Sequence, residues 1–159
     1  KDINIYCNNI TVKALYNEFP YVFEKEKYPG VPKVNINLFT NKEFYVNDIK
    51  IVPIKAMHYK LTVFGFRINN FVYLTDVSEI SDKEKQKLYN ADLVVLDALR
   101  KEKHISHFSL DEALSLLDEV KPKQAVLTHV SHYMGLHDEV NKELPDNIKL
   151  GFDNQVFNL

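Results

Sequence analysis

The sequence predicts a single α/β domain, residues 1–159, built on a mixed β-sheet. Three observations lead to this prediction. Short strands separated by tight polar breaks fill residues 43–75, which is typical of antiparallel hairpins. From residue 81 onward, buried apolar strands alternate with helices, which is typical of parallel strands. A length of 159 residues is enough for one domain with a substantial core.

The first part of the chain is predicted to hold two strands around a helix. Residues 3–6 and 34–38 alternate polar and apolar side chains, as half-exposed strands do. Thr11 is expected to cap a helix that ends before Pro20. Residues 20–32 are rich in proline and contain a glycine, so they are predicted to form a loop.

A meander of four strands is expected next. Asn47-Asp48 and Asn69-Asn70 fit tight turns, because Asn and Asp tolerate left-handed backbone angles. When consecutive hairpins pair, the first and third of three strands run in the same direction. His58 and Asp76 follow two such strands, so they are expected at the same edge of the sheet. The four predicted strands are residues 43–46, 49–57, 61–68 and 71–75.

The two helices predicted after Asp76 each begin with a capping box. Ser81 with Glu84 opens a helix that is mostly charged and is expected to be exposed. Ser109 with Glu112 opens a helix with an apolar face, which is expected to pack firmly. The residues of that face are Leu110, Ala113, Leu114, Leu117 and Val120.

The remaining predicted elements complete the sheet. Residues 93–96 and 125–128 are continuous apolar runs and are expected to be strands covered on both faces. Residues 136–143 are predicted to be a helix. Residues 148–152 and 155–158 are predicted to form a closing hairpin.

Composition and charge narrow the function classes. The net charge of −2 gives no basis for nucleic-acid binding through bulk charge, so nucleic-acid partners are not expected. No apolar run reaches the roughly 20 residues that span a bilayer, so no membrane association is expected. The single cysteine, Cys7, excludes an internal disulfide and fits a reducing, cytoplasmic location. The chain starts within a predicted strand and without Met, which we interpret as a sign of a fragment.

Three residues that follow predicted strands point to a metal site. His58, Asp76 and His129 carry nitrogen and oxygen ligands, which suit Zn, Mn or Fe. Each also has a simpler interpretation. Asp76 could cap a turn, and His58 could be an ordinary partly buried histidine. His132 competes with His129 as the ligand; we favour His129 and expect His132 to orient the site.

Four further residues near the same edge are candidates for catalysis or substrate binding. His107 precedes a predicted helix start, where an anionic substrate is favoured, although a solvent-facing loop histidine fits equally well. The solvent-facing interpretation is stronger for His104. Asp97 either orients a ligand or only finishes its strand. Arg100 is a candidate anion contact or an ordinary surface arginine.

The order and spacing of four motifs resemble the second half of the metallo-β-lactamase superfamily, specifically its PhnP-like phosphodiesterase branch. The resemblance covers nearly the whole chain, to Gly151-Phe152-Asp153. The motifs are Tyr73-Leu74-Thr75-Asp76, Leu96-Asp97-Ala98-Leu99-Arg100, His104-x-x-His107-Phe108-Ser109 and Leu127-Thr128-His129-x-Ser131-His132.

The resemblance implies an αββα sandwich with two divalent metal ions that activate water for hydrolysis. His58 resembles a ligand to one metal, Asp76 the carboxylate that bridges both, and His129 the last ligand to the second. His107 resembles the family's active-site histidine, which contacts the phosphate or the leaving group. The expected substrate is a small phosphodiester or another small molecule.

The family's His-x-His-x-Asp-His motif does not occur in these residues. Three ligands are too few for two ions, so this chain alone is expected to be inactive. The expected partner is therefore a missing N-terminal half or a second copy of the chain in a homodimer. The alternative is a non-catalytic binding or structural module of the same fold.

Overall fold

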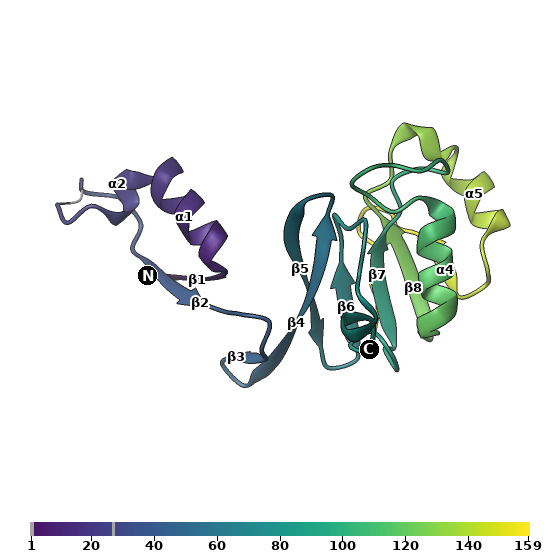
Figure 1. Ribbon diagram of the computed structural model, residues 1–159, viewed down its shortest axis with the longest axis horizontal. Helices are drawn as coiled ribbons and strands as arrows, with labels where there is room; N and C mark the ends of the chain where they lie inside the picture. Colours follow the sequence, from purple (N-terminus) through teal and green to yellow (C-terminus); the bar gives the residue numbers. More distant parts are fainter. Residues whose placement is uncertain (1, 27) are drawn as a thin grey trace. The chain divides into compact units, whose positions relative to one another are not determined.

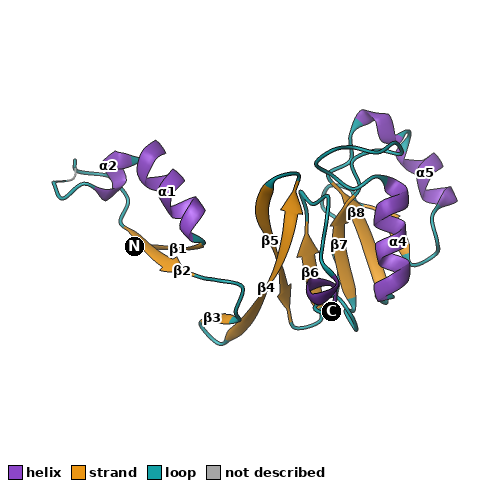
Figure 2. Ribbon diagram, in the orientation of Figure 1, coloured by secondary structure: helices purple, strands orange, loops and turns teal. Residues whose placement is uncertain are grey.

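The computed structural model describes residues 2–26 and 28–159 (Figures 1 and 2). The chain divides into two compact units, Lys1–Lys42 and Glu43–Leu159. The expectation of a single domain stays a prediction.

The first unit is a two-stranded parallel sheet joined by helices. The predicted strands are confirmed, but the start of the first helix is wrong: Asn8 caps it, accepting a hydrogen bond from the Thr11 amide at 2.9 Å. Asn is as good a cap as Thr and lies three residues earlier. The predicted loop contains a short helix, because proline fits a first helical position. The elements are β1 (Ile3–Cys7), α1 (Asn9–Glu18), α2 (Pro20–Phe23) and β2 (Val34–Leu38).

The second unit contains a seven-stranded mixed sheet in the order β3-β4-β5-β6-β7-β8-β9. Strands β3 to β6 pair antiparallel, and β6 to β9 pair parallel, which confirms the predicted fold class. The strands are β3 (Phe44–Val46), β4 (Ile49–His58), β5 (Leu61–Ile68), β6 (Phe71–Leu74), β7 (Leu93–Asp97), β8 (Gln124–Thr128) and β9 (Ile148–Leu150). The helices are α3 (Asp82–Lys85), α4 (Leu110–Val120) and α5 (His137–Glu143), with a 3-10 turn at His132–Met134.

The predicted hairpins position the edge of the sheet on which the site lies. Asn47 and Asn69 adopt φ angles of 51° and 52°, the left-handed conformation expected of these turns. β4 and β6 each pair antiparallel with β5, so they run in the same direction. His58 at the end of β4 and Asp76 beyond β6 therefore reach the same edge, as predicted.

The core lies between the sheet and α4, which is drawn beside β8 in Figure 2. The capping box of Ser109 and Glu112 forms as predicted, and the helix ends at Lys121, whose φ is 48°. The buried residues that line this core include Val72 and Leu74 of β6, Val94 and Leu96 of β7, Leu127 of β8, and Ala113, Leu117 and Val120 of α4.

The predicted capping box at Ser81 is wrong. The Ser81 side chain makes no capping hydrogen bond, and α3 is only four residues long. Glu84 turns inward instead and is 5% exposed. Its carboxylate accepts hydrogen bonds from the Lys55 amide at 2.8 Å and from Nζ of Lys87 at 2.7 Å. A buried carboxylate must find such partners, and this requirement overrides the local capping pattern.

The predicted closing hairpin is also wrong. β9 pairs in parallel with β8, and residues 155–158 are not a strand. The chain instead turns after β9, where the Gln155 amide donates to the carbonyl of Phe152 at 3.2 Å. The alternation of polar and apolar residues correctly predicted the strand β9, but it could not show that β9 pairs with β8.

Arg67 holds together the end of the sheet opposite the site. Its guanidinium group donates to the carbonyls of Asn69 at 2.7 Å, Lys87 at 2.9 Å and Tyr89 at 2.6 Å. These contacts tie the β5–β6 turn to the segment that leads into β7. In the part of the chain that the structure describes, no helix is long and apolar enough to cross a membrane.

Candidate metal centre

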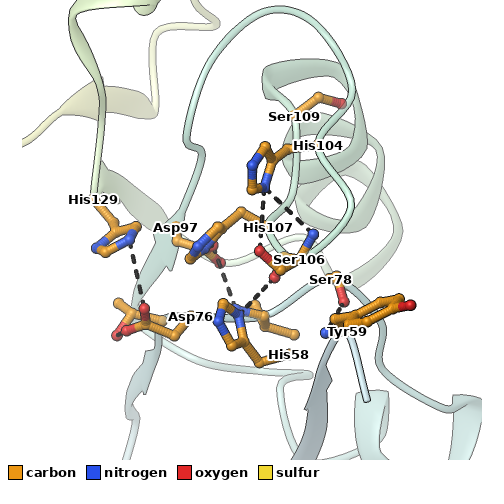
Figure 3. Close-up of polar contacts among 12 residues, drawn as sticks. His58, Tyr59, Asp76, Ser78, Asp97, His104, Ser106, His107, Ser109 and His129 are labelled. Atoms are coloured by element: carbon orange, nitrogen blue, oxygen red, sulfur yellow. Dashed lines mark hydrogen bonds and ion pairs between the residues drawn. The ribbon is translucent and has the colours of Figure 1, made fainter. Parts of the chain in front are cut away.

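Five polar residues gather at the carboxyl ends of β4, β6, β7 and β8 (Figure 3). His58 and Asp97 are the last residues of β4 and β7. Asp76 lies two residues beyond β6, and His129 directly follows β8. The parallel strands carry three of these side chains to one edge, which is where α/β sheets usually bind ligands. The fifth residue, His107, comes from the loop between β7 and α4.

Asp76 and His129 share the same unusual backbone conformation. Both have a φ of 58°, which is uncommon for residues other than glycine. Their side chains meet, with Nε2 of His129 at 3.5 Å from Oδ1 of Asp76. Strained residues of this kind concentrate at functional sites because the surrounding structure must hold them in place.

Three side chains lie close enough together to hold one metal ion. Each of His58, Asp76 and His107 offers a ligand atom, and these atoms all lie within 4.8 Å of one another. The imidazole rings of His58 and His107 are 4.6 Å apart, centroid to centroid. Two nitrogens and a carboxylate oxygen suit Zn²⁺ and similar ions. His107, for which the sequence predicted a contact with the phosphate or the leaving group, thus lies close enough to His58 and Asp76 to be an alternative metal ligand.

A hydrogen bond orients His58 for metal binding. Its Nδ1 lies 2.8 Å from the carbonyl oxygen of Ser106. A carbonyl oxygen can only accept, so Nδ1 carries the proton and Nε2 keeps a free lone pair. Such a contact is the usual means by which a metal-binding histidine is fixed in one tautomer.

Asp97 lies behind His107, with its Oδ2 at 3.2 Å from Nδ1 of the imidazole. The Asp97 side chain is fully buried, and its Oδ1 has no hydrogen-bond partner among the described residues. Burial raises the pKa of Asp97 to about 7, and the negative charge of Asp76 adds to this effect. The amide of Val77, which donates to Oδ2 at 3.4 Å, opposes it.

The environment of His107 favours its neutral form. Burial lowers the pKa of His107, and the neighbouring His129 and His58 lower it further. The rings of His107 and His129 stack with their centroids 4.7 Å apart. A neutral imidazole can bind a metal ion or accept a proton near neutral pH.

Arg100 supports the loop that carries His104 and His107. Its guanidinium group donates to the carbonyls of Glu102 at 3.3 Å and Lys103 at 2.9 Å. The anion contact of Arg100 stays a prediction. His104 lies beside His107, with their ring centroids 5.3 Å apart, so it is nearer the site than a solvent-facing loop residue.

The structure brings His129, rather than His132, to Asp76. His132 is exposed and stacks on Tyr133, with the ring centroids 3.9 Å apart. Ser106, whose carbonyl fixes His58, was missed by the sequence analysis. Its contribution comes from the backbone, so its residue type carries no signal.

Comparison with known proteins identifies the family and the fold of this chain. Residues 1–130 match the family model described as "Beta-lactamase superfamily domain". A solved diphosphatase of the PhnP family has a TM-score of 0.87 and 28% identity, and the match covers 100% of this chain and 60% of that one. The metallo-beta-lactamase fold protein YhfI of Bacillus subtilis has a TM-score of 0.70 at 21% identity, covering 93% of this chain and 61% of that one.

A curated relative extends the comparison. An octanoyltransferase of Porphyromonas gingivalis is 28% identical over 155 residues, which are 96% of this chain and 32% of that protein. The chain thus spans about a third of this relative and less than two thirds of the diphosphatase. The family match covers most of the chain and includes the strand edge that carries the histidines and carboxylates, so the chain belongs to the beta-lactamase superfamily and has the metallo-β-lactamase fold.

Proposed function

We propose that the whole protein is a metal-dependent hydrolase that cleaves a small phosphodiester. The observation that carries this proposal is the convergence of His58, Asp76 and His107 within 4.8 Å at one strand edge. Structural similarity to a PhnP-family diphosphatase supports phosphate chemistry. The slightly negative net charge favours a small substrate over a nucleic acid.

The residues fit two divalent ions that share Asp76, and we propose Zn, Mn or Fe. Asp76 belongs to the cluster with His58 and also contacts His129, as a bridging carboxylate would. Bound ions at such a site activate water and stabilise the charge that develops on the phosphoryl group. Two ions need more ligands than these side chains supply. We propose that the others come from a part of the whole protein that precedes these residues or from a second copy in a homodimer.

The pair of Asp97 and His107 supplies the proton transfer in this proposal. When ionised, Asp97 accepts a hydrogen bond from Nδ1 of His107 and leaves Nε2 directed away from it. In this role Nε2 of neutral His107 is not a metal ligand: it takes up a proton from the attacking water and donates it to the departing oxygen of the substrate. The buried position of Asp97 holds the ring in one orientation while the proton moves.

Acyl chemistry is a second candidate, because the curated relative is an octanoyltransferase. The chain covers 32% of that protein, so the matched third need not carry its transferase activity. A non-catalytic module of the same fold remains the alternative from outside the hydrolases. The cytoplasmic location stays a prediction, which the free thiol of Cys7 supports.

Metal content and substrate panels test these proposals together. The whole protein, purified without chelators, is expected to contain about two equivalents of Zn, Mn or Fe by mass spectrometry. It is expected to hydrolyse bis(p-nitrophenyl) phosphate faster than p-nitrophenyl octanoate. Faster hydrolysis of the octanoate would mean that the protein is an acyl hydrolase and not a phosphodiesterase. Protein that holds no metal and cleaves neither compound would be the non-catalytic module.

A further inference from the structure

Ser106 hydrogen bonds to two histidines through opposite backbone groups (Figure 3). Its carbonyl accepts from Nδ1 of His58 at 2.8 Å, and its amide donates to Nδ1 of His104 at 3.3 Å. Its hydroxyl lies 3.2 Å from the same nitrogen of His104. A backbone carbonyl only accepts and a backbone amide only donates, so the direction of both backbone hydrogen bonds is fixed.

These two contacts impose opposite tautomers on neighbouring imidazoles. In neutral His58 the proton sits on Nδ1, and Nε2 offers a lone pair. In neutral His104 the nitrogen Nδ1 is the acceptor, so the proton sits on Nε2. His58 is therefore suited to bind a cation, whereas His104 is suited to donate a hydrogen bond to an oxygen of a substrate.

His104 is held firmly in a position to use this N–H group. Its ring lies 5.3 Å from that of His107, which belongs to the ligand cluster. Nε2 of His104 has no hydrogen-bond partner within residues 2–26 and 28–159. The loop is closed by the hydrogen bond from the Leu99 amide to the Phe108 carbonyl at 2.9 Å and by the guanidinium contacts of Arg100.

We propose that His104 binds the substrate by donating its Nε2–H to a phosphoryl oxygen that is not displaced, and that Ser106 is the positioning residue for this bond. The inference rests on the proposed phosphodiesterase function. A phosphoryl group carries several acceptor oxygens and a negative charge, so it gains from a fixed donor beside His107. His104 then contributes substrate binding, while His107 serves the departing oxygen.

The tautomers can be measured without any activity assay. Long-range ¹H–¹⁵N NMR of the whole protein, free of metal, is expected to show the proton of His104 on Nε2 and that of His58 on Nδ1. Ser106→Ala keeps both backbone groups, so it is expected to retain both tautomers. A proton on Nδ1 of His104 would overturn the proposal. Loss of the tautomers in Ser106→Ala would overturn the assignment to the backbone.

Kinetics separate binding from chemistry. His104→Phe keeps a ring but removes the donor, so KM for bis(p-nitrophenyl) phosphate is expected to rise about tenfold or more with little change in kcat. His104→Gln places an amide N–H near the lost one and is expected to recover part of the loss. His137→Phe, on α5, is the matched control for replacing a histidine by phenylalanine. An unchanged KM in His104→Phe would contradict the proposal.

A binding measurement keeps this inference distinct from the proposed function. Inorganic phosphate is titrated calorimetrically into the zinc-loaded whole protein and into its His104→Phe variant. Weakening by about tenfold or more in the variant supports the phosphate contact even if no diester is cleaved. Equal affinity in both proteins would refute the contact even if the diester is cleaved.

Discussion

Asp76 and His129 face each other from the two strands that flank β7, each held in the left-handed conformation at a φ of 58°. Nε2 of His129 is 3.5 Å from Oδ1 of Asp76. Because both backbones are constrained in the same way, the two side chains are oriented before any ligand binds. This relationship makes Asp76 the central residue of the proposed metal centre, and the first two predictions follow from it.

Replacing Asp76 with alanine is expected to remove the ligand that two ions would share. In the whole protein, Asp76→Ala should lose at least one equivalent of metal and at least about tenfold in activity on bis(p-nitrophenyl) phosphate. Metal content and kcat/KM are the measurements. The control is Asp138→Ala, because the Asp138 side chain on α5 is 94% exposed. Activity of Asp76→Ala close to that of the control would rule out a bridging role.

His129 and His132 are distinguished by a pair of alanine variants. His129→Ala should lower the metal affinity of the whole protein by about ten- to a hundredfold, because it removes a proposed ligand. His132→Ala should leave the affinity within about twofold, because the His132 ring is exposed and stacks on Tyr133. Competition with a chromogenic chelator measures both affinities. A larger loss in His132→Ala would reverse the assignment of the ligand.

The fold could be predicted largely because hydrophobic pattern and turn chemistry agree. Asn47 and Asn69 mark the turns of the meander, and counting strand directions places His58 and Asp76 at one edge. What the pattern missed depends on contacts between distant residues. Glu84 is buried because Lys55 of β4 and Lys87 donate hydrogen bonds to its carboxylate. Strand β9 pairs with β8 and not with the residues that follow β9.

The site was predictable where residue type carries the signal. The search for histidines and carboxylates that follow strands led directly to His58, Asp76 and His129 as candidate ligands. The closeness of His107 to His58 and Asp76 could be learned only from the three-dimensional structure, and the role of Ser106 comes from backbone atoms that every residue has. The hydrogen bonds by which Arg100 supports its own loop also go to backbone carbonyls, so the sequence could not predict them.

Burial of Asp97 makes stability depend on pH in the metal-free protein. The pKa of Asp97 is about 7 in the folded protein and 3.8 for an ordinary exposed aspartate, so between these values the native state holds a proton that the unfolded state has lost. The free energy of unfolding should therefore fall as pH rises from about 4 to about 7, then level off. The fall is of the order of a few kcal/mol, since each pKa unit corresponds to about 1.4 kcal/mol.

The variant Asp97→Asn tests this dependence. Its amide cannot ionise, so chemical denaturation in the presence of EDTA should show a flatter stability profile between about pH 4 and 7 and a more stable protein at pH 8. The same variant should lower kcat, because His107 loses its carboxylate partner. Parallel stability profiles for the variant and the parent would contradict the raised pKa.

Gly65 is required by close packing between β5 and β6. A Cβ at this position would lie 2.6 Å from Cδ1 of Leu74 and 2.7 Å from the carbonyl oxygen of Tyr73. Gly65→Ala should therefore destabilise the protein by about 1–3 kcal/mol, as overpacking of a core does. Denaturant unfolding measures the loss. Lys60→Ala, at an exposed position between β4 and β5, is the control and should change stability by less than about 0.5 kcal/mol.

The anchoring of the sheet by Arg67 has a consequence for how such a protein changes over evolution. The guanidinium group secures one end of the strands, while every candidate ligand and substrate contact is placed at the other. Loops at the end that carries the candidate ligands can therefore be lengthened, shortened or exchanged, while the opposite end keeps the strands in register. A fold built in this way can acquire new substrates by changes in these loops alone.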